Sequence, residues 1–306
     1  MKHEKHKKLI QPNWGLWGRN EWAFVGGKCS DIHDISKCII GNLKEFNSLY
    51  IDADHKSHDE GAALEFDTLT DKIGYYEWAT NTTPNKFTIR PQLSSYNLIL
   101  VNGNHHQAQR QIVIVDKDKE KSLKKRLDQL SRVDAIILHP NCSNTLFDFL
   151  DDYLQKTGQN PLRLNWQDTE TLSQFLVEKI QPAPLKALLL VGGKSQRMGE
   201  DKALLDYHGK PQYQHVYDML SSKIEEVYIS CRADQIDRYS GYSCLADTFD
   251  DLGPIGGILS ALRKDPNAPW LVVACDMPLV NQETSDPLIE ERNALAAGPA
   301  YTSTFS

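Results

Sequence analysis

The sequence has no apolar run long enough to span a membrane, and its N-terminus lacks the apolar segment of a signal peptide. It has no excess of positive charge either. The formal net charge of −7 argues against a general nucleic-acid-binding protein. Its six cysteines form no CxxC pair, so they are interpreted as reduced thiols rather than as zinc ligands. These absences predict a cytoplasmic protein with no membrane or nucleic-acid partner.

The length of 306 residues is large for a single hydrophobic core, so two domains are expected. Apolar strand candidates alternate with helix candidates in both halves, which predicts βαβ units and mainly parallel sheets. The run QPAP at 181–184 has two prolines where a helix cannot continue. We therefore predict an α/β fold with two three-layer domains, residues 1–180 and 185–306, joined by a linker at 181–184.

The expected elements follow from the spacing of apolar residues. In the first half, strands are expected at 21–27, 48–54, 96–104, 111–117 and 134–140. Helices are expected there at 33–46, 119–130, 145–156 and 168–179. In the second half, strands are expected at 185–193, 226–231 and 269–275, and a helix is expected to begin at about Lys202.

The segment LLLVGGKSQRMGEDKALL (Leu188–Leu205) is an apolar strand that runs into two glycines and a polar loop. Glycines allow backbone N–H groups to approach phosphate oxygens closely. Arg197 and Lys202 add positive charge where a leaving pyrophosphate gathers negative charge. A glycine pair alone is weak evidence, but the pattern GGxSxRMGxDK is much more specific. The loop is not a Walker A loop, because no GxxxxGK[ST] occurs. It predicts a triphosphate site.

Two later segments carry matching features. ADTFDDLGPIGGILSAL (Ala246–Leu262) contains an acidic loop, a glycine-rich turn and a helix start, where unpaired N–H groups are available to a ligand. Gly253, Gly256 and Gly257 would let this loop lie against a nucleotide. VVACDMPLV places Asp276 just past a buried strand, at the edge where open α/β sheets bind ligands. A single carboxylate there suits Mg²⁺, which takes its other ligands from water and phosphate.

These three segments resemble the motifs of molybdenum cofactor guanylyltransferases, a family of α/β nucleotidyltransferases. The resemblance implies a Rossmann-like second domain that transfers GMP from GTP to molybdopterin and releases pyrophosphate. It implies Mg²⁺ bound by Asp276, and catalytic roles for Arg197, Lys202 and Asp276. The nucleotide-binding residues it implies are Leu190, Val191, Gly192, Gly193, Lys202, Ser230, Asp247, Gly253, Gly256 and Asp276. Ser230 stands where some members carry asparagine, which weakens the prediction of the base.

Family members continue beyond the point at which this sequence ends, with strands and helices that contribute to the molybdopterin side. The final residues NALAAGPAYTSTFS resemble a strand interrupted within a domain. We therefore expect the second domain, 185–306, to be C-terminally incomplete, and the chain to bind GTP but to turn over slowly. Molybdoenzymes or their chaperones are the expected recipients of the product.

The first half resembles, more loosely, the molybdopterin-guanine dinucleotide adaptor proteins, which are P-loop GTP binders. The likeness lies in the order of elements and in two segments, DADHKSHD and LILVNGNHHQAQRQIVIVDK. Where a P-loop would sit, the chain has VGGKCSDIHDISK (Val25–Lys37), without GK[ST] at the helix start. The first domain is therefore interpreted as a degenerate nucleotide-binding fold that serves as a docking or structural module.

Histidines and aspartates gather after two expected strands of the first half. They are Asp52, Asp54, His55, His58, His105 and His106. If the strands are neighbours, imidazole and carboxylate groups could meet and bind a divalent transition metal. Histidines on surface loops are the simpler interpretation, and we favour it.

Other functions remain open at this point. The glycine-rich loop is shared by nucleotidyltransferases that transfer CMP to molybdopterin or a nucleotide to a sugar phosphate. An alternative from a different class of function is a non-catalytic protein that binds and delivers the cofactor. The intact Arg197, Lys202 and Asp276 favour catalysis over that alternative.

Overall fold

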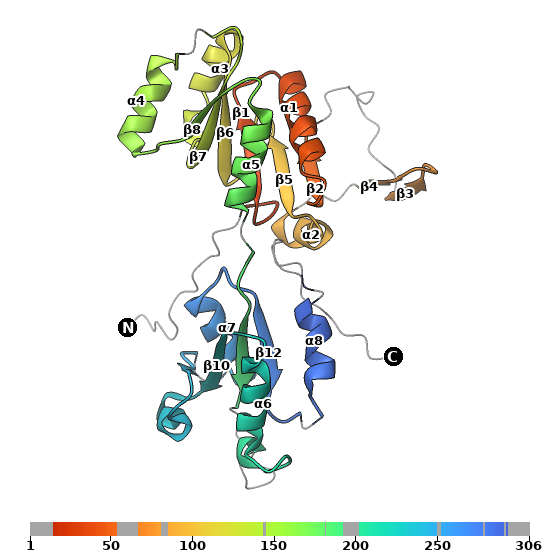
Figure 1. The fold of residues 1–306 in the computed structure, drawn as a ribbon, viewed down its shortest axis with the longest axis vertical. Coiled ribbons are helices and arrows are strands. Elements are labelled where there is room, and N and C mark those ends of the chain that lie inside the picture. Colours follow the sequence, from red (N-terminus) through yellow and green to blue (C-terminus); the bar gives the residue numbers. More distant parts are fainter. Residues whose placement is uncertain are drawn as a thin grey trace. The chain divides into compact units, whose positions relative to one another are not determined.

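The computed structural model describes residues 15–53, 67–80, 85–142, 145–180, 182–191, 202–249, 252–277, 279–290 and 292. The chain divides into two compact units, consisting mainly of Trp14–Gln181 and Pro182–Ala294. Each unit has a parallel sheet with helices on both faces (Figure 1). The predicted α/β class with mainly parallel sheets is confirmed. Within the described residues, no helix has the length and hydrophobicity needed to cross a bilayer.

The first unit is built on a six-stranded sheet in the order β2-β5-β1-β6-β7-β8, in which every pair is parallel. Its strands are β1 (Glu21–Val25), β2 (Ser48–Ile51), β5 (Leu98–Asn102), β6 (Arg110–Val115), β7 (Val133–Leu138) and β8 (Leu162–Asn165). Strand β8 was not expected, because its sequence LRLN is short and only two of its four residues are apolar. The central strands are buried along their whole length, as parallel strands covered on both faces require.

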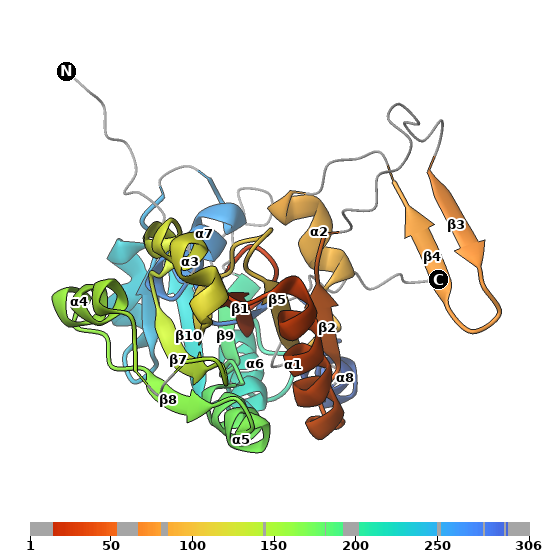
Figure 2. The ribbon, with the colours of Figure 1, turned by 90° about the horizontal axis from the view of Figure 1, so that it is seen from above.

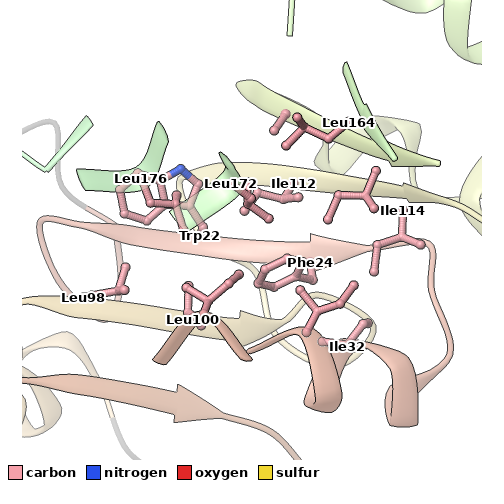
Figure 3. Packing of buried hydrophobic residues seen from close by; sticks show 14 of the residues in the cluster. Trp22, Phe24, Ile32, Leu98, Leu100, Ile112, Ile114, Leu164, Leu172 and Leu176 are labelled. Atoms are coloured by element: carbon pink, nitrogen blue, oxygen red, sulfur yellow. The ribbon is translucent and has the colours of Figure 1, made fainter. Parts of the chain in front are cut away.

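Successive side chains of β1 supply two separate cores. Trp22 and Phe24 face α1 (Cys29–Asn42) and α5 (Thr169–Lys179), whereas Ala23 and Val25 face α3 (Glu120–Lys124) and α4 (Asp148–Thr157). Figure 3 shows Trp22 and Phe24 in the middle of the first core, among leucine and isoleucine side chains of β5, β6 and the two helices. Figure 2 shows α1 and α5 together on one side of the sheet.

Other parts of the first unit also differ from expectation. The expected helix 119–130 is broken into the 3-10 helix η1 (Lys117–Lys119), the short α3, and the 3-10 helix η2 (Leu127–Gln129). The basic run 124–126 offers no apolar face to continue a helix, and only Leu123 and Leu130 are fully buried in this stretch. The hairpin of β3 (Thr68–Asp71) and β4 (Tyr76–Ala79), and α2 (Lys86–Gln92), were not predicted.

The second unit has a four-stranded parallel sheet in the order β11-β10-β9-β12. The strands are β9 (Lys186–Leu190), β10 (Glu226–Cys231), β11 (Cys244–Ala246) and β12 (Trp270–Ala274). Helices α6 (Gln212–Ser221) and α8 (Gln282–Glu290) contribute to the core on one face, and α7 (Pro254–Lys264) lies on the other. Leu190 is in register with both Ser230 and Ala274, so β9, β10 and β12 end at one level.

The helix expected to begin at Lys202 is only a single 3-10 turn, η3 (Lys202–Leu204). The chain then reverses at Gly209, whose φ is +76°, and an isolated bridge joins Asp206 to Pro211. Pro211, which cannot donate a backbone hydrogen bond, is the N-cap of α6. The glycine and the proline therefore move the helix start ten residues along the chain, from Lys202 to Gln212.

Candidate functional site

The four strands of the second sheet are parallel, so the loops that follow them begin at the same side of the sheet, where the strands have their carboxyl ends. Three backbone hydrogen bonds extend the parallel ladder past the strand ends: Val191 N–H to Ser230 O at 3.3 Å, Asp247 N–H to Cys231 O at 2.8 Å, and Cys275 N–H to Leu190 O at 3.1 Å. These bonds fix the position at which the loops after the strands begin. The residues predicted to bind a nucleotide therefore lie at the same side of the sheet, where the strands have their carboxyl ends. Ligands bind at this side in open α/β sheets.

Two glycines allow the first turn of α7 to lie directly on that side of the sheet. A Cβ on Gly256 would lie 2.4 Å from Asp247 Oδ2, and a Cβ on Gly257 would lie 2.3 Å from Ser230 Oγ. Gly253, the N-cap, has a φ of +56° and, as a glycine, has no side chain with which to cap the helix. The N-terminus of α7 therefore leaves N–H groups available for an anionic ligand.

The carboxylate of Asp247 holds its own loop in place. Its Oδ1 accepts hydrogen bonds from the Phe249 N–H at 2.9 Å and from the Ser260 hydroxyl at 3.2 Å. The same serine lies 3.0 Å from the N–H of Thr248 and accepts from it. Asp247 is thus an ordering residue of the loop, and its contact with a nucleoside stays a prediction.

Ser230 is nearly buried, with 5% of its surface exposed, and its hydroxyl is covered by Gly257 of α7. A side chain in this position supports the packing of α7 on β10. Its predicted contact with the nucleotide is not tested by this geometry, and stays a prediction.

Asp276 is exposed and follows the carboxyl end of β12, the edge strand next to β9. Asp247 follows β11, the outer strand on the other side of β9 and β10. The backbones of β11 and β12 are three strand spacings, or about 14 Å, apart. The two carboxylates therefore cannot share one metal ion. A single exposed carboxylate beside the strand that leads into the phosphate loop fits Mg²⁺, because this ion keeps several water and phosphate ligands.

Part of the predicted phosphate loop, including Gly192, Gly193 and Arg197, lies outside the described residues. Of the flanking residues, Val191 is buried directly after β9, and Lys202 begins η3.

Gln212 is a residue of this region that sequence reasoning missed. It is fully buried, its Nε2 donates to Met277 O at 3.4 Å, and its backbone N–H donates to Leu205 O at 2.9 Å. The first residue of α6 thus connects the turn that follows Lys202 with the turn that carries Asp276. A glutamine after a proline would normally be assigned to the surface, so no sequence signal marks it.

The glycines of the first unit have a packing role. The chain passes from β1 to α1 through Gly26, Gly27 and Lys28 alone. A Cβ on Gly26 would lie 2.6 Å from Ile114 O, and one on Gly27 would lie 2.8 Å from Ile114 Cδ1. Lys28 forms an ion pair with Asp118 at 2.8 Å. A connection this short, with its cation already paired, agrees with the missing P-loop motif.

The histidines named above as candidate metal ligands, in the interpretation that we did not favour, lie only partly within the described residues. Asp54, His55 and His58 lie outside them. His105 contacts Cys29, whereas His106 packs edge-on against Trp17 with ring centroids 5.5 Å apart. Among the residues that the structure describes, no group of three or more histidine, cysteine, aspartate or glutamate side chains could hold a metal ion.

The contact between Gly257 and Ser230 gives a testable prediction. Replacing Gly257 by alanine should destabilise the second unit by about 1–3 kcal/mol, because the added methyl meets the Ser230 hydroxyl. The double variant Gly257→Ala/Ser230→Ala should recover part of this loss, because it removes the oxygen atom but keeps the contacts of the added methyl with Leu190 Cδ2 at 3.1 Å and with the Cβ of residue 230 at 3.3 Å. Thermal unfolding of the parent, both single variants and the double variant measures the coupling. Additive losses would show that the two residues do not touch.

Comparison with known proteins agrees with the geometry. Residues 187–305 match the family model described as the MobA-like NTP transferase domain. A molybdenum cofactor biosynthesis bifunctional protein from Synechocystis sp. is 40% identical over 114 residues, which are 37% of this chain and 33% of that protein. A molybdenum cofactor guanylyltransferase from Pseudomonas putida is 36% identical over 121 residues, covering 38% of this chain and 62% of that enzyme. The chain thus spans about a third and about three fifths of these relatives.

Two solved structures are also similar. Molybdopterin-guanine biosynthesis protein B covers 52% of this chain and 97% of its own, with 15% identity and a TM-score of 0.35. Bacillus subtilis MobB covers 53% of this chain and 98% of its own, with 12% identity and a TM-score of 0.38. The similarity to the MobA-like NTP transferase domain comes from the sequence match alone, and it covers residues 187–305.

Proposed function

We propose that the second unit is a nucleotidyltransferase that transfers GMP from GTP to the terminal phosphate of molybdopterin and releases pyrophosphate. The observation that carries the proposal is that the four parallel strands end at the same side of the sheet, with the first turn of α7 lying against Asp247 and Ser230 through Gly256 and Gly257. The resemblance of the sequence motifs and the names of the relatives favour guanine and molybdopterin over other bases and acceptors.

The reaction joins two anions. A phosphate oxygen of molybdopterin forms a bond to the α-phosphorus of GTP, and the bond from that phosphorus to the oxygen of the leaving pyrophosphate breaks. Such a transfer needs charge neutralisation and alignment more than a strong base. We assign no general base, because the attacking phosphate is already ionised. Arg197 and Lys202 are assigned to the negative charge of the leaving group.

Asp276 is the residue proposed to hold Mg²⁺. Bound there, the ion would neutralise charge on the triphosphate. Gln212 contributes by holding the Met277 carbonyl, which fixes the turn of Asp276 relative to α6. Asp247 orders the loop that follows β11, the outer strand furthest from β12.

The test is pyrophosphate release with molybdopterin and, in turn, GTP, CTP, ATP or UTP. The proposal expects release with GTP and several-fold less with the other three. Preference for CTP would assign the cytidine reaction instead. Release that requires a sugar phosphate rather than molybdopterin would assign a different acceptor. Binding of molybdopterin without release of pyrophosphate from any nucleotide would make the chain a non-catalytic cofactor-binding protein.

We propose a docking or structural role for the first unit. The pairing of Lys28 with Asp118 and the three-residue connection between β1 and α1 support this role, because neither suits a triphosphate.

A further inference from the structure

The first unit carries a cysteine and a histidine in contact at the start of a helix. Cys29 is the first residue of α1, is exposed, and has its Sγ 3.3 Å from Nε2 of His105. A second group reaches the same sulfur, because Nδ2 of Asn104 lies 3.7 Å from it. The two contacts come from a loop more than seventy residues away along the chain, so they are a product of the fold.

The backbone explains why these groups meet. Gly103, directly after β5, donates its N–H to Phe24 O of β1 at 2.8 Å, and a Cβ there would lie 2.6 Å from the same oxygen. This close crossing brings the loop after β5 onto the start of α1. The side chain of Asn104 then fixes the loop by donating to Gly27 O at 2.9 Å.

We propose that Cys29 is a thiol–disulfide exchange site, with His105 as its proton acceptor, that forms mixed disulfides with small disulfide compounds. Three features of the site favour this chemistry. The thiol lies within hydrogen-bonding distance of an imidazole, which is the arrangement of an activated nucleophile. Cys29 is the first residue of a 14-residue helix, where backbone N–H groups have no partner within the helix, and the side chain of the N-cap residue Lys28 makes no capping hydrogen bond. The sulfur is also exposed to solvent.

The exchange is balanced without a further reactant. His105 accepts the proton of the Cys29 thiol, and the thiolate attacks one sulfur of the small disulfide. A bond forms between Cys29 Sγ and that sulfur as the original S–S bond breaks. The leaving thiolate takes up the proton from the imidazole. Cys29 is oxidised, and half of the small disulfide is reduced to a free thiol.

The other cysteines are poor competitors. Cys231 and Cys275 are buried, and burial raises the pKa of the Cys231 thiol to about 11. Burial also raises the pKa of Cys142 and of Cys244. Cys38 is exposed on the same helix, nine residues further along, and within the described residues no histidine contacts its sulfur as His105 contacts that of Cys29. It is a matched control within the same molecule.

The test uses the full chain and glutathione disulfide. Trypsin separates the two exposed cysteines, because cleavage after Lys28, Lys37 and Lys44 gives the peptides CSDIHDISK and CIIGNLK. Mass spectrometry at successive times gives both rates in one sample. Cys29 is expected to form the mixed disulfide about tenfold faster than Cys38 at neutral pH. Equal rates in the unmodified protein would overturn the proposal.

Two variants test whether the faster reaction of Cys29 depends on its neighbouring side chains rather than on its exposure to solvent. His105→Gln should reduce the rate at Cys29 to near that of Cys38 while leaving the Cys38 rate unchanged. Asn104→Ala should have a smaller effect in the same direction. If His105→Gln left the ratio of the two rates unchanged, His105 would not be the proton acceptor and the proposal would be wrong. None of these measurements depends on nucleotidyl transfer.

Discussion

Replacing Asp276 by asparagine is expected to lower the rate of pyrophosphate release from GTP and molybdopterin by at least about 100-fold. The exposed carboxylate follows β12, next to the strand that leads into the phosphate loop, and it is the proposed Mg²⁺ ligand. Asparagine keeps the shape of the side chain but removes its charge, so the triphosphate would lose charge neutralisation without loss of the fold. A coupled assay of pyrophosphate measures the rate.

The matched control for this variant is Glu225→Gln. Glu225 is also exposed, but it precedes β10 and therefore lies at the opposite end of the sheet. The control should release pyrophosphate at the parent rate. If Asp276→Asn also kept the parent rate, Asp276 would have no part in the reaction.

Replacing Asp134 by alanine is expected to destabilise the first unit by about 3–5 kcal/mol. Asp134 accepts a hydrogen bond from Trp22 Nε1 at 2.8 Å and pairs with Arg110 Nε at 2.5 Å. The guanidinium of Arg110 also lies over the Trp22 ring, 4.2 Å from its centroid. Only 7% of the Arg110 side chain is exposed, so loss of Asp134 would leave a buried charge without its carboxylate partner.

Urea denaturation followed by circular dichroism measures this loss of stability. Asp151→Ala is the control, because Asp151 forms an exposed ion pair with Arg163 at 3.3 Å. Exposed pairs contribute about 0–1 kcal/mol, so this variant should unfold close to the parent. Similar losses for the two variants would contradict the role assigned to the buried pair.

The location of the candidate site could be predicted from the sequence. Continuous apolar runs predicted the parallel strands, and Asp276 lies two residues after the end of β12. The end of the sheet at which Asp276 lies could therefore be predicted without knowledge of long-range contacts. The glycine-rich turn before α7 was expected at the same end for the same reason. The structure adds that Gly256 and Gly257 are in close contact with Asp247 and Ser230.

Other features depend on contacts between residues far apart in sequence. Gln212 is polar, and only the packing of α6 against the turn at Met277 buries it. The pair of Cys29 and His105 depends on the close crossing of Gly103 over β1. The prediction of a helix that begins at Lys202 was wrong, because Gly209 and Pro211 determine the path of the chain there more strongly than the spacing of apolar residues does.

The most direct test of Mg²⁺-dependent nucleotide handling by the second unit is a calorimetric titration of the full chain with GTP. We predict saturable binding of one GTP in the presence of Mg²⁺. We also predict clearly weaker binding after chelation of the metal, and a similar weakening in Asp276→Asn with Mg²⁺ present. Absence of GTP binding, or an affinity unchanged by both chelation and the substitution, would contradict the proposed site.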